Sequence, residues 1–294
     1  MHDLTAEVFA SKPWSSLPEL VSPPNMLAPV EVKMLSWLAG NVRLEGRSLV
    51  DAGSFLGGST CALASGADRN TSTSKKDGII HAYDLFRVQP LPFARKIMGD
   101  RPLGSSTLDV FEENIASYRH LITIHEGDFM QAAPPEEPVA ILFVDIAKTW
   151  ELNDRVVRDF FPLLVAGESI VVQQDHNDHS CPWVNVTMEY YADHFEYVAD
   201  AASSRLFRYV RHIPSDELVD IGLLPLDEKI GLAERAAARS RDRVSAFLSS
   251  VSVAWLLREK SQQAANEYLD RLRDEQPWKS ETRYVDMVRT AMRY

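Results

Sequence analysis

Five aspartates mark the places in this sequence where chemistry-bearing side chains are most concentrated. Each stands at or just after the end of a short apolar run that is typical of a buried strand. They are Asp51, Asp84, Asp128, Asp145 and Asp175. Carboxylates accept hydrogen bonds from hydroxyl and amino groups and hold cations. A single aspartate often caps a turn or a helix, but five in chain order favour a shared ligand site over capping.

The stretch from Asp51 to Thr60 reads Asp-Ala-Gly-Ser-Phe-Leu-Gly-Gly-Ser-Thr and contains a glycine-rich turn. Glycine lets the backbone approach a ligand closely, and the first turn of the following helix offers unpaired N–H groups. The pattern is neither the dinucleotide G-x-G-x-x-G nor the P-loop, because no lysine follows the second glycine. It therefore predicts a nucleotide-binding corner of another kind, or a turn whose glycines meet only steric needs.

Strand-like and helix-like segments alternate between residues 48 and 194, which predicts a parallel sheet with helices on both faces. Seven strands are expected, at 48–50, 79–84, 121–126, 139–144, 169–174, 195–199 and 204–210, and the last two suggest a hairpin. In open α/β sheets ligands bind outside the carboxyl ends of the strands, where the strand order reverses. The five aspartates are therefore expected along one edge of the sheet.

Three parts of the chain are expected. Residues 1–47 form an N-terminal arm and a helix, 48–212 form the ligand-binding catalytic domain, and 213–294 form a helical C-terminal extension. The extension contains three helical stretches, at about 227–250, 251–275 and 280–294, and would cap the domain or mediate dimerisation. The proline-containing segment 85–106 is long for a simple connection and is typical of a lid or binding loop.

Composition indicates a soluble globular protein. The formal net charge is -11, and most of the acidic excess lies in residues 1–212. This acidity argues against a nucleic-acid partner and favours a small neutral or cationic ligand, although solubility alone would also explain it. Cys61 and Cys181 cannot form a disulfide framework, no signal peptide is recognisable, and no apolar run is long enough to span a bilayer. We therefore expect a cytoplasmic protein without a membrane partner.

From residue 26 to 210 the chain resembles the class I S-adenosylmethionine (SAM) methyltransferases, on the basis of the glycine-rich turn and the ordered aspartates. It looks most like the metal-dependent O-methyltransferases of sugars and natural products, the macrocin O-methyltransferase-like group. The resemblance implies a Rossmann-like α/β fold with a seven-stranded, mostly parallel sheet whose last strand is antiparallel. It also implies that SAM contacts Asp51, Gly53, Ser54, Gly57, Ser59, Asp84, Asp128, Phe129 and Asp145.

In this family the acid after the second strand accepts hydrogen bonds from the ribose hydroxyls, which would be the role of Asp84. Asp128 corresponds to the position beside the adenine amino group, and Phe129 would flank the base. The resemblance further implies a divalent metal, Mg²⁺ or another ion, held by Asp145, Asp175 and His176. His176 replaces an acid of the relatives, which would favour a softer ion such as Mn²⁺, Fe²⁺ or Zn²⁺.

The reaction half of the predicted site departs from the family pattern. Ala147 stands where relatives often carry an aspartate that acts as base, and Lys148 stands where they often carry histidine. Lys148 can accept a proton only if its pKa is strongly lowered; otherwise it would be an ammonium that pairs with Asp145 and takes the place of the metal. The candidate catalytic residues are therefore Lys148, His176 and Asp145, and His179 is a further proton acceptor.

Together these features predict O-methylation of a hydroxyl on a small natural-product or sugar-like acceptor, by a homodimer formed through the C-terminal helices. The enzyme has to align the acceptor oxygen with the methyl group and remove its proton, and a metal could assist both steps. Two alternatives stay open. One is a SAM-binding protein of the same fold with a different reaction or no catalytic role, and the other is a nicotinamide- or nucleotide-binding α/β protein.

Overall fold

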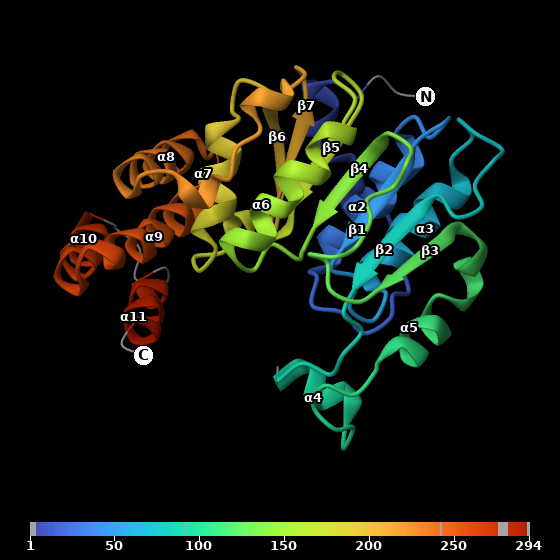
Figure 1. Ribbon diagram of the computed structural model, residues 1–294, viewed down its shortest axis with the longest axis horizontal. Coiled ribbons are helices and arrows are strands. Elements are labelled where there is room, and N and C mark those ends of the chain that lie inside the picture. The colour runs from blue at the N-terminus through green and yellow to red at the C-terminus, as the bar shows by residue number, and fades with distance from the viewer. Residues whose placement is uncertain (1–3, 91, 242, 276–281, 293–294) are drawn as a thin grey trace.

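A seven-stranded sheet forms the centre of the computed structural model, which describes residues 4–90, 92–241, 243–275 and 282–292 (Figure 1). Its strands are β1 (Ser48–Ala52), β2 (Ile80–Asp84), β3 (Ile122–Glu126), β4 (Val139–Val144), β5 (Ile170–Gln173), β6 (Phe195–Ala201) and β7 (Ser204–Tyr209). The strand order is β3-β2-β1-β4-β5-β7-β6. Strands β1 to β5 pair in parallel, whereas β7 is antiparallel to both β5 and β6. The predicted Rossmann-like α/β fold, mostly parallel with an antiparallel last strand, is confirmed.

The strand order reverses at β1, which pairs with β2 on one side and with β4 on the other. Every residue of β1 and of β4 is buried, which explains why β4 is an unbroken apolar run: helices cover both of its faces. In the β1–β4 pair, Ala52 is level with Val144, so the two strands end side by side. Ligands of open α/β sheets bind at such a reversal point.

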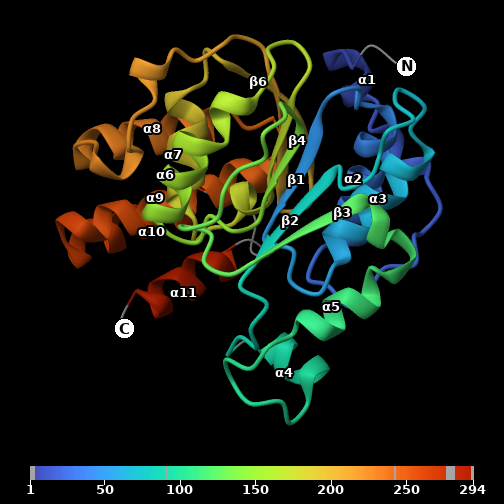
Figure 2. The same ribbon diagram turned by 45° about the vertical axis from the view of Figure 1, so that its right-hand side comes forward.

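Helices lie on both faces of the sheet (Figures 1 and 2). They are α1 (Ala6–Ala10), α2 (Pro29–Asn41), α3 (Gly58–Arg69), α4 (Pro92–Met98), α5 (Leu108–Asn114), α6 (Trp150–Asp159), α7 (Pro182–Tyr190), α8 (Leu226–Arg239), α9 (Arg243–Lys260), α10 (Gln262–Glu275) and α11 (Thr282–Ala291). Apolar residues of α2 and α3 pack with Leu49 and Ile141 on one face, and those of α6 and α7 pack with Val50 and Leu142 on the other. The alternation of side chains along each strand thus divides the core into two layers.

The C-terminal helices lie beside α7 (Figure 1). Ile230 of α8 and Val253 of α9 belong to the same apolar cluster as α7, while α9, α10 and α11 form a further cluster of their own. The prediction of a single helix over 227–250 is wrong, because α8 ends at Arg239 and the backbone of the next residue, Ser240, is extended. The next break also falls at a serine, since Ser261 Oγ accepts a hydrogen bond from Ala264 N at the start of α10.

The segment after β2 projects from the carboxyl edge of the sheet and carries α4 (Figures 1 and 2). A bridge between Arg87 and Ser106 closes its base. Val88 and Met98 pack with Leu56 of the glycine-rich turn in a small apolar cluster of their own. The predicted long connection is thus attached directly to the turn after β1. Within the described part of the chain, no helix combines the length and hydrophobicity needed to cross a membrane.

Candidate functional site

The glycine-rich turn after β1 packs directly against the end of β4. Gly53 has φ +104°, and a Cβ added there would lie 2.8 Å from the carbonyl carbon and oxygen of Asp145. Asp145 N donates to Ala52 O at 2.7 Å, and Gly53 N donates to Tyr83 O at 2.9 Å. Only glycine meets both demands, a positive φ and this close approach. Gly53 therefore sets how near Asp145 comes to the turn.

Asp51 is completely buried below this turn. Its Oδ2 accepts hydrogen bonds from Ser59 Oγ at 3.0 Å and from Thr60 Oγ1, which connects β1 to the first turn of α3. Its Oδ1 has no hydrogen-bond partner among the described residues. Burial raises the pKa of Asp51 to about 6. Because an unpaired buried acceptor costs free energy, a ligand donor that reaches Oδ1 would be stabilised.

The remaining predicted residues of the turn, Ser54 and Gly57, shape its backbone. Ser54 is buried, and its Oγ donates to the carbonyl oxygen of Asp51 at 3.1 Å. Gly57 has φ +92° and is the residue that precedes α3. Gly58 lies so close to the N-terminal arm that an added Cβ would be 2.3 Å from Asn25 Cβ. The sequence offers no signal for Asn25, which is 33 positions away, yet it covers the beginning of α3.

Asp84 connects the turn after β1 to the end of β2. Its Oδ2 accepts a hydrogen bond from Phe55 N at 2.9 Å, and its Oδ1 accepts one from Phe86 N at 2.7 Å. Burial raises its pKa above the ordinary value. Each carboxylate oxygen still has a lone pair for another donor. The next side chain, Leu85, is 45% exposed at the same edge.

Asp128 and Phe129 lie after β3 in different environments. Asp128 is exposed, and its Oδ1 accepts a hydrogen bond from Met130 N at 2.9 Å. Phe129 is only 3% exposed, and its ring stacks on Phe160 with 5.1 Å between the ring centroids. Tyr83 meets the same ring edge-on. Phe129, which was predicted to flank a nucleobase, thus has its ring buried among core side chains.

Three charged side chains meet at the ends of β4 and β5. Lys148 Nζ donates to Asp145 Oδ1 at 2.7 Å and also to Asp175 Oδ2. The two strands are adjacent and in register, which brings the two aspartates to the same edge. The side chain of Lys148 is 51% exposed, whereas those of Asp145 and Asp175 are 21% and 16% exposed. We call Asp145, Lys148 and Asp175 the charged triad.

The two carboxylates of the triad favour the charged form of its lysine. Burial raises the pKa of both Asp145 and Asp175. For Lys148, burial acts to lower the pKa, but the two neighbouring carboxylates outweigh it and raise the pKa above the ordinary value. An ammonium has no lone pair with which to accept a proton, so the interpretation of Lys148 as the base does not hold. Its other predicted role, a cation paired with Asp145, is the one that the geometry matches.

His176 follows Asp175 directly but points elsewhere. It is 2% exposed, its ring centroid lies 5.4 Å from that of Phe207, and burial lowers its pKa well below the ordinary value. Residues 174–177 form a short turn after β5, and it is kinked at Asp175, whose φ of -91° and ψ of 19° are not helical. Asp175 therefore turns toward Lys148 while His176 enters the core.

The predicted metal site of Asp145, Asp175 and His176 is corrected by this geometry. The imidazole does not join the two carboxylates, and the ammonium of Lys148 lies between them. No group of three His, Cys, Asp or Glu side chains that could hold a metal occurs within the described ranges. The donor set thus does not fit a divalent ion.

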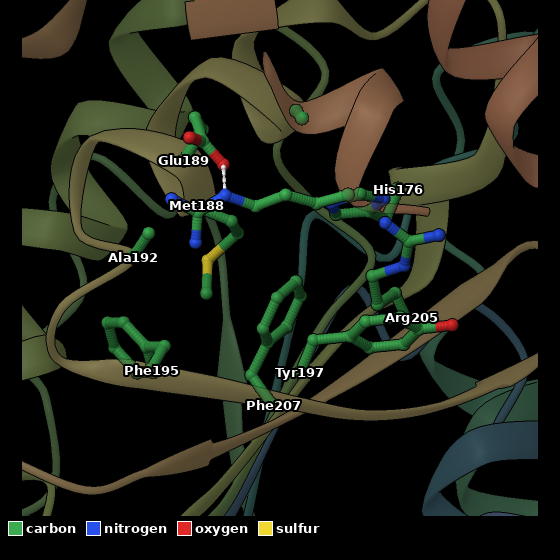
Figure 3. Close-up of a pocket in the computed structure, with 10 residues that line it drawn as sticks. His176, Met188, Glu189, Ala192, Phe195, Tyr197, Arg205 and Phe207 are labelled. Carbon is green, nitrogen blue, oxygen red and sulfur yellow. Dashed lines mark ion pairs between the residues drawn. The ribbon is translucent and has the colours of Figure 1, made fainter. Parts of the chain in front are cut away.

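Sequence reasoning also missed a cavity behind His176, between β6, β7, α7 and α8 (Figure 3). Its polar lining includes Glu189, Arg205 and Arg239. These residues come from elements that are far apart in the chain, and no motif in the sequence connects them.

The order of the strands and the glycine-rich turn at the reversal point together identify the fold. A β3-β2-β1-β4-β5-β7-β6 sheet with an antiparallel β7, and with a glycine-rich turn after β1, is the Rossmann-like fold of class I SAM-dependent methyltransferases. No model of a protein family matches this sequence. No curated protein matches it either.

Several solved structures are similar to this chain. Two are of CalS11, described as a TDP-rhamnose 3′-O-methyltransferase in calicheamicin biosynthesis and as a calicheamicin methyltransferase; they are 17% and 15% identical, with TM-scores of 0.42 and 0.45. The matches cover 61% and 71% of this chain and 77% and 94% of CalS11. PhzM, a pyocyanin biosynthetic protein, is 15% identical with a TM-score of 0.35, over 60% of this chain and 55% of PhzM.

A Pyrococcus horikoshii protein proposed to be an RNA methyltransferase is 14% identical, with a TM-score of 0.37 over 70% of this chain and 98% of that one. At such identities and TM-scores these four matches identify no activity for this chain. The assignment of the fold rests on the strand order and directions described above.

Proposed function

We propose that this protein is a SAM-dependent methyltransferase that methylates a hydroxyl of a small natural-product or sugar-like acceptor. The observation that carries the proposal is the glycine-rich turn at the reversal point, with a carboxylate on each side of it. Below the turn, Asp51 has a buried carboxylate oxygen without a hydrogen-bond partner in the described part of the chain. At the end of β2, each carboxylate oxygen of Asp84 can accept one more hydrogen bond. SAM carries a positive charge and several donors, which suit such an edge.

The residues present fit this cofactor. Asp84 would accept the ribose hydroxyls, Asp128 the adenine amino group, and Asp51 and the turn from Gly53 to Ser59 would hold the methionine end. Leu85 offers an exposed apolar surface beside Asp84 for the base. When bound, SAM supplies a methyl group on a sulfonium, which is already activated for transfer. The protein then has only to place the acceptor and to move one proton.

The charged triad is suited to that second task. Lys148 places a positive charge, held by two carboxylates, at the exposed edge beside the turn. A fixed positive charge stabilises the oxyanion that develops when an acceptor hydroxyl loses its proton. Asp145 would receive the proton, because it lies against Gly53 and its pKa is raised by burial. Since the ammonium of Lys148 already pairs with both carboxylates, the proposal assigns no divalent ion to them.

Calorimetric titration with SAM tests the proposal. We expect saturable binding with one molecule per chain, and no comparable heat with NADH. A folded protein that binds NADH but not SAM would overturn the proposal in favour of a nicotinamide-binding protein. If SAM binds but a mass-spectrometric screen of hydroxylated acceptors shows no methylation, the non-catalytic alternative replaces it. Dimer formation through α8 to α11 stays a prediction, which sedimentation velocity would test.

A further inference from the structure

The cavity behind His176 has a volume of about 60 Å³ and lies apart from the charged triad. The aromatic side chains of Phe195, Tyr197 and Phe207 line it on the strand side (Figure 3). Glu189 of α7 and Arg239 of α8 lie on its helix side. The cavity is thus apolar along one wall and charged along the other. Neither Lys148 nor Asp145 lines it, so its role does not depend on the proposed function.

His176 is the buried polar group that this cavity leaves without a partner. Its side chain lines the cavity and is 2% exposed, and Nδ1 makes no hydrogen bond within the described part of the chain. Leaving a buried ring nitrogen unpaired is costly. A neutral imidazole carries one N–H donor and one acceptor. A ligand that fills the cavity and pairs with the ring would remove that cost.

The charges around the cavity favour an anion. Arg205 is 2% exposed and donates from Nε and Nη2 to Asp200. Arg239 Nε lies 3.1 Å from one oxygen of Glu189, and Arg235 Nε lies 3.4 Å from the other. Among the charged residues that line the cavity, two are arginines, Arg205 and Arg239, and one is Glu189, which leaves a positive excess in the lining; Asp200 and Arg235 pair with them from outside it. This local excess contrasts with the net charge of -11 for the whole chain.

The volume limits what can enter. It exceeds the roughly 10–15 Å³ that a cavity needs to hold one water molecule, and it is less than half of the ~150 Å³ of a cavity that takes up benzene. That space suits a carboxylate group with a short apolar tail, and it is too small for a sugar ring or a nucleoside. We propose that this cavity is a binding site for the carboxylate end of a small organic acid, with the tail against the aromatic wall and the carboxylate toward Arg239, Arg205 and His176.

Two arginines of α8 provide a matched pair of variants. Arg239 lines the cavity and Arg235 does not, although both pair with Glu189 and their side chains are 61% and 59% exposed. The probe is propionate, titrated into the full-length protein while the ¹⁵N signals of the histidine rings are followed by NMR. Propionamide serves as the uncharged control of the same shape. We expect propionate to shift the His176 signal with saturation, and propionamide to leave it unchanged.

Arg239→Gln should weaken propionate binding by about tenfold or more, because a charge-assisted hydrogen bond is lost. Arg235→Gln should change the dissociation constant of propionate by less than about threefold, because Arg235 does not line the cavity and its removal only weakens the electrostatic potential there. His176→Phe, in which propionate binding is followed by the line width of the propionate methyl signal, should abolish binding, and the arginine pair decides the matter if that variant does not fold. Equal binding of propionamide, an unmoved His176 signal, or equal effects of the two arginine variants would overturn the proposal.

Discussion

The two ends of the candidate site are held by different kinds of interaction. At the β1–β2 end, backbone geometry dominates: Asp84 accepts two backbone N–H groups, and Gly53 fits only because it has no side chain. At the β4–β5 end, three charged side chains hold one another, and one of them is half exposed. The first arrangement is determined by the path of the chain. The second depends on a single residue, Lys148, and can therefore change its chemistry by one substitution.

The strongest test of this contrast is Lys148→Met, which removes the charge and keeps most of the side chain's length. Loss of a fixed group that stabilises a developing oxyanion typically lowers kcat by about 10²–10³. We expect a loss of that size in methyl transfer, while the dissociation constant of SAM changes by less than about threefold. Steady-state kinetics and calorimetry measure the two quantities. Lys148→Arg keeps the charge and should retain more activity; an undiminished kcat in Lys148→Met would remove the triad from the mechanism.

A second prediction concerns the buried carboxyl of Asp51. Its pKa is raised to about 6, from an ordinary value of 3.8. Between these values the folded state holds a proton that the unfolded state has released, so the free energy of unfolding falls as pH rises. The shift corresponds to about 3 kcal/mol.

Chemical denaturation of the wild type and of Asp51→Asn between pH 4 and 7 measures this effect. The variant cannot titrate at this position. As the pH rises to about 6, the free energy of unfolding of the wild type should therefore fall relative to that of the variant, and above pH 6 the difference should stay constant. A difference that is independent of pH would show that Asp51 titrates normally.

Gly53→Ala tests the backbone character of the β1–β2 end. A Cβ there combines a positive φ with a contact of 2.8 Å to the Asp145 backbone. We expect the free energy of unfolding to fall by about 2 kcal/mol or more. Gly46 is the control, because it has φ +66° with nothing within 4 Å of an added Cβ. Gly46→Ala should cost about 1 kcal/mol, from the left-handed conformation alone. Equal losses in urea denaturation would contradict the close approach of β1 and β4.

The smallest expected effects belong to Asp84 and Asp128. Asp84→Asn keeps the shape but loses the negative charge and one of the two oxygens that accept backbone N–H groups. Loss of charge assistance to the ribose hydroxyls should raise the dissociation constant of SAM by about tenfold, which calorimetry would measure. Asp128→Asn, at an exposed position, should raise it less. If Asp84→Asn leaves the dissociation constant unchanged, Asp84 does not accept the ribose hydroxyls.

Most of the fold was predictable because its signals are local. The apolar run Val139–Val144 is unbroken because both faces of β4 are covered, and the glycines after β1 show where the chain turns. The end of α10 at Glu275 agrees with the prediction, but the division expected near residue 250 is wrong, because the breaks at Ser240 and Ser261 contain neither glycine nor proline. A cap of that kind depends on a single side chain, which the hydrophobic pattern does not reveal.

The sequence by itself determined the seven strands and the glycine-rich turn, because strand period and turn chemistry act over a few neighbouring residues. Only the tertiary structure decided that Lys148 lies between Asp145 and Asp175, and that His176 enters the core. The first result needs the pairing of β4 with β5, which joins residues 27 positions apart. The second needs the turn after β5, which is kinked at Asp175 and sends two adjacent side chains in different directions. A side chain's neighbours across a sheet edge follow from the path of the whole chain, and no local pattern encodes them.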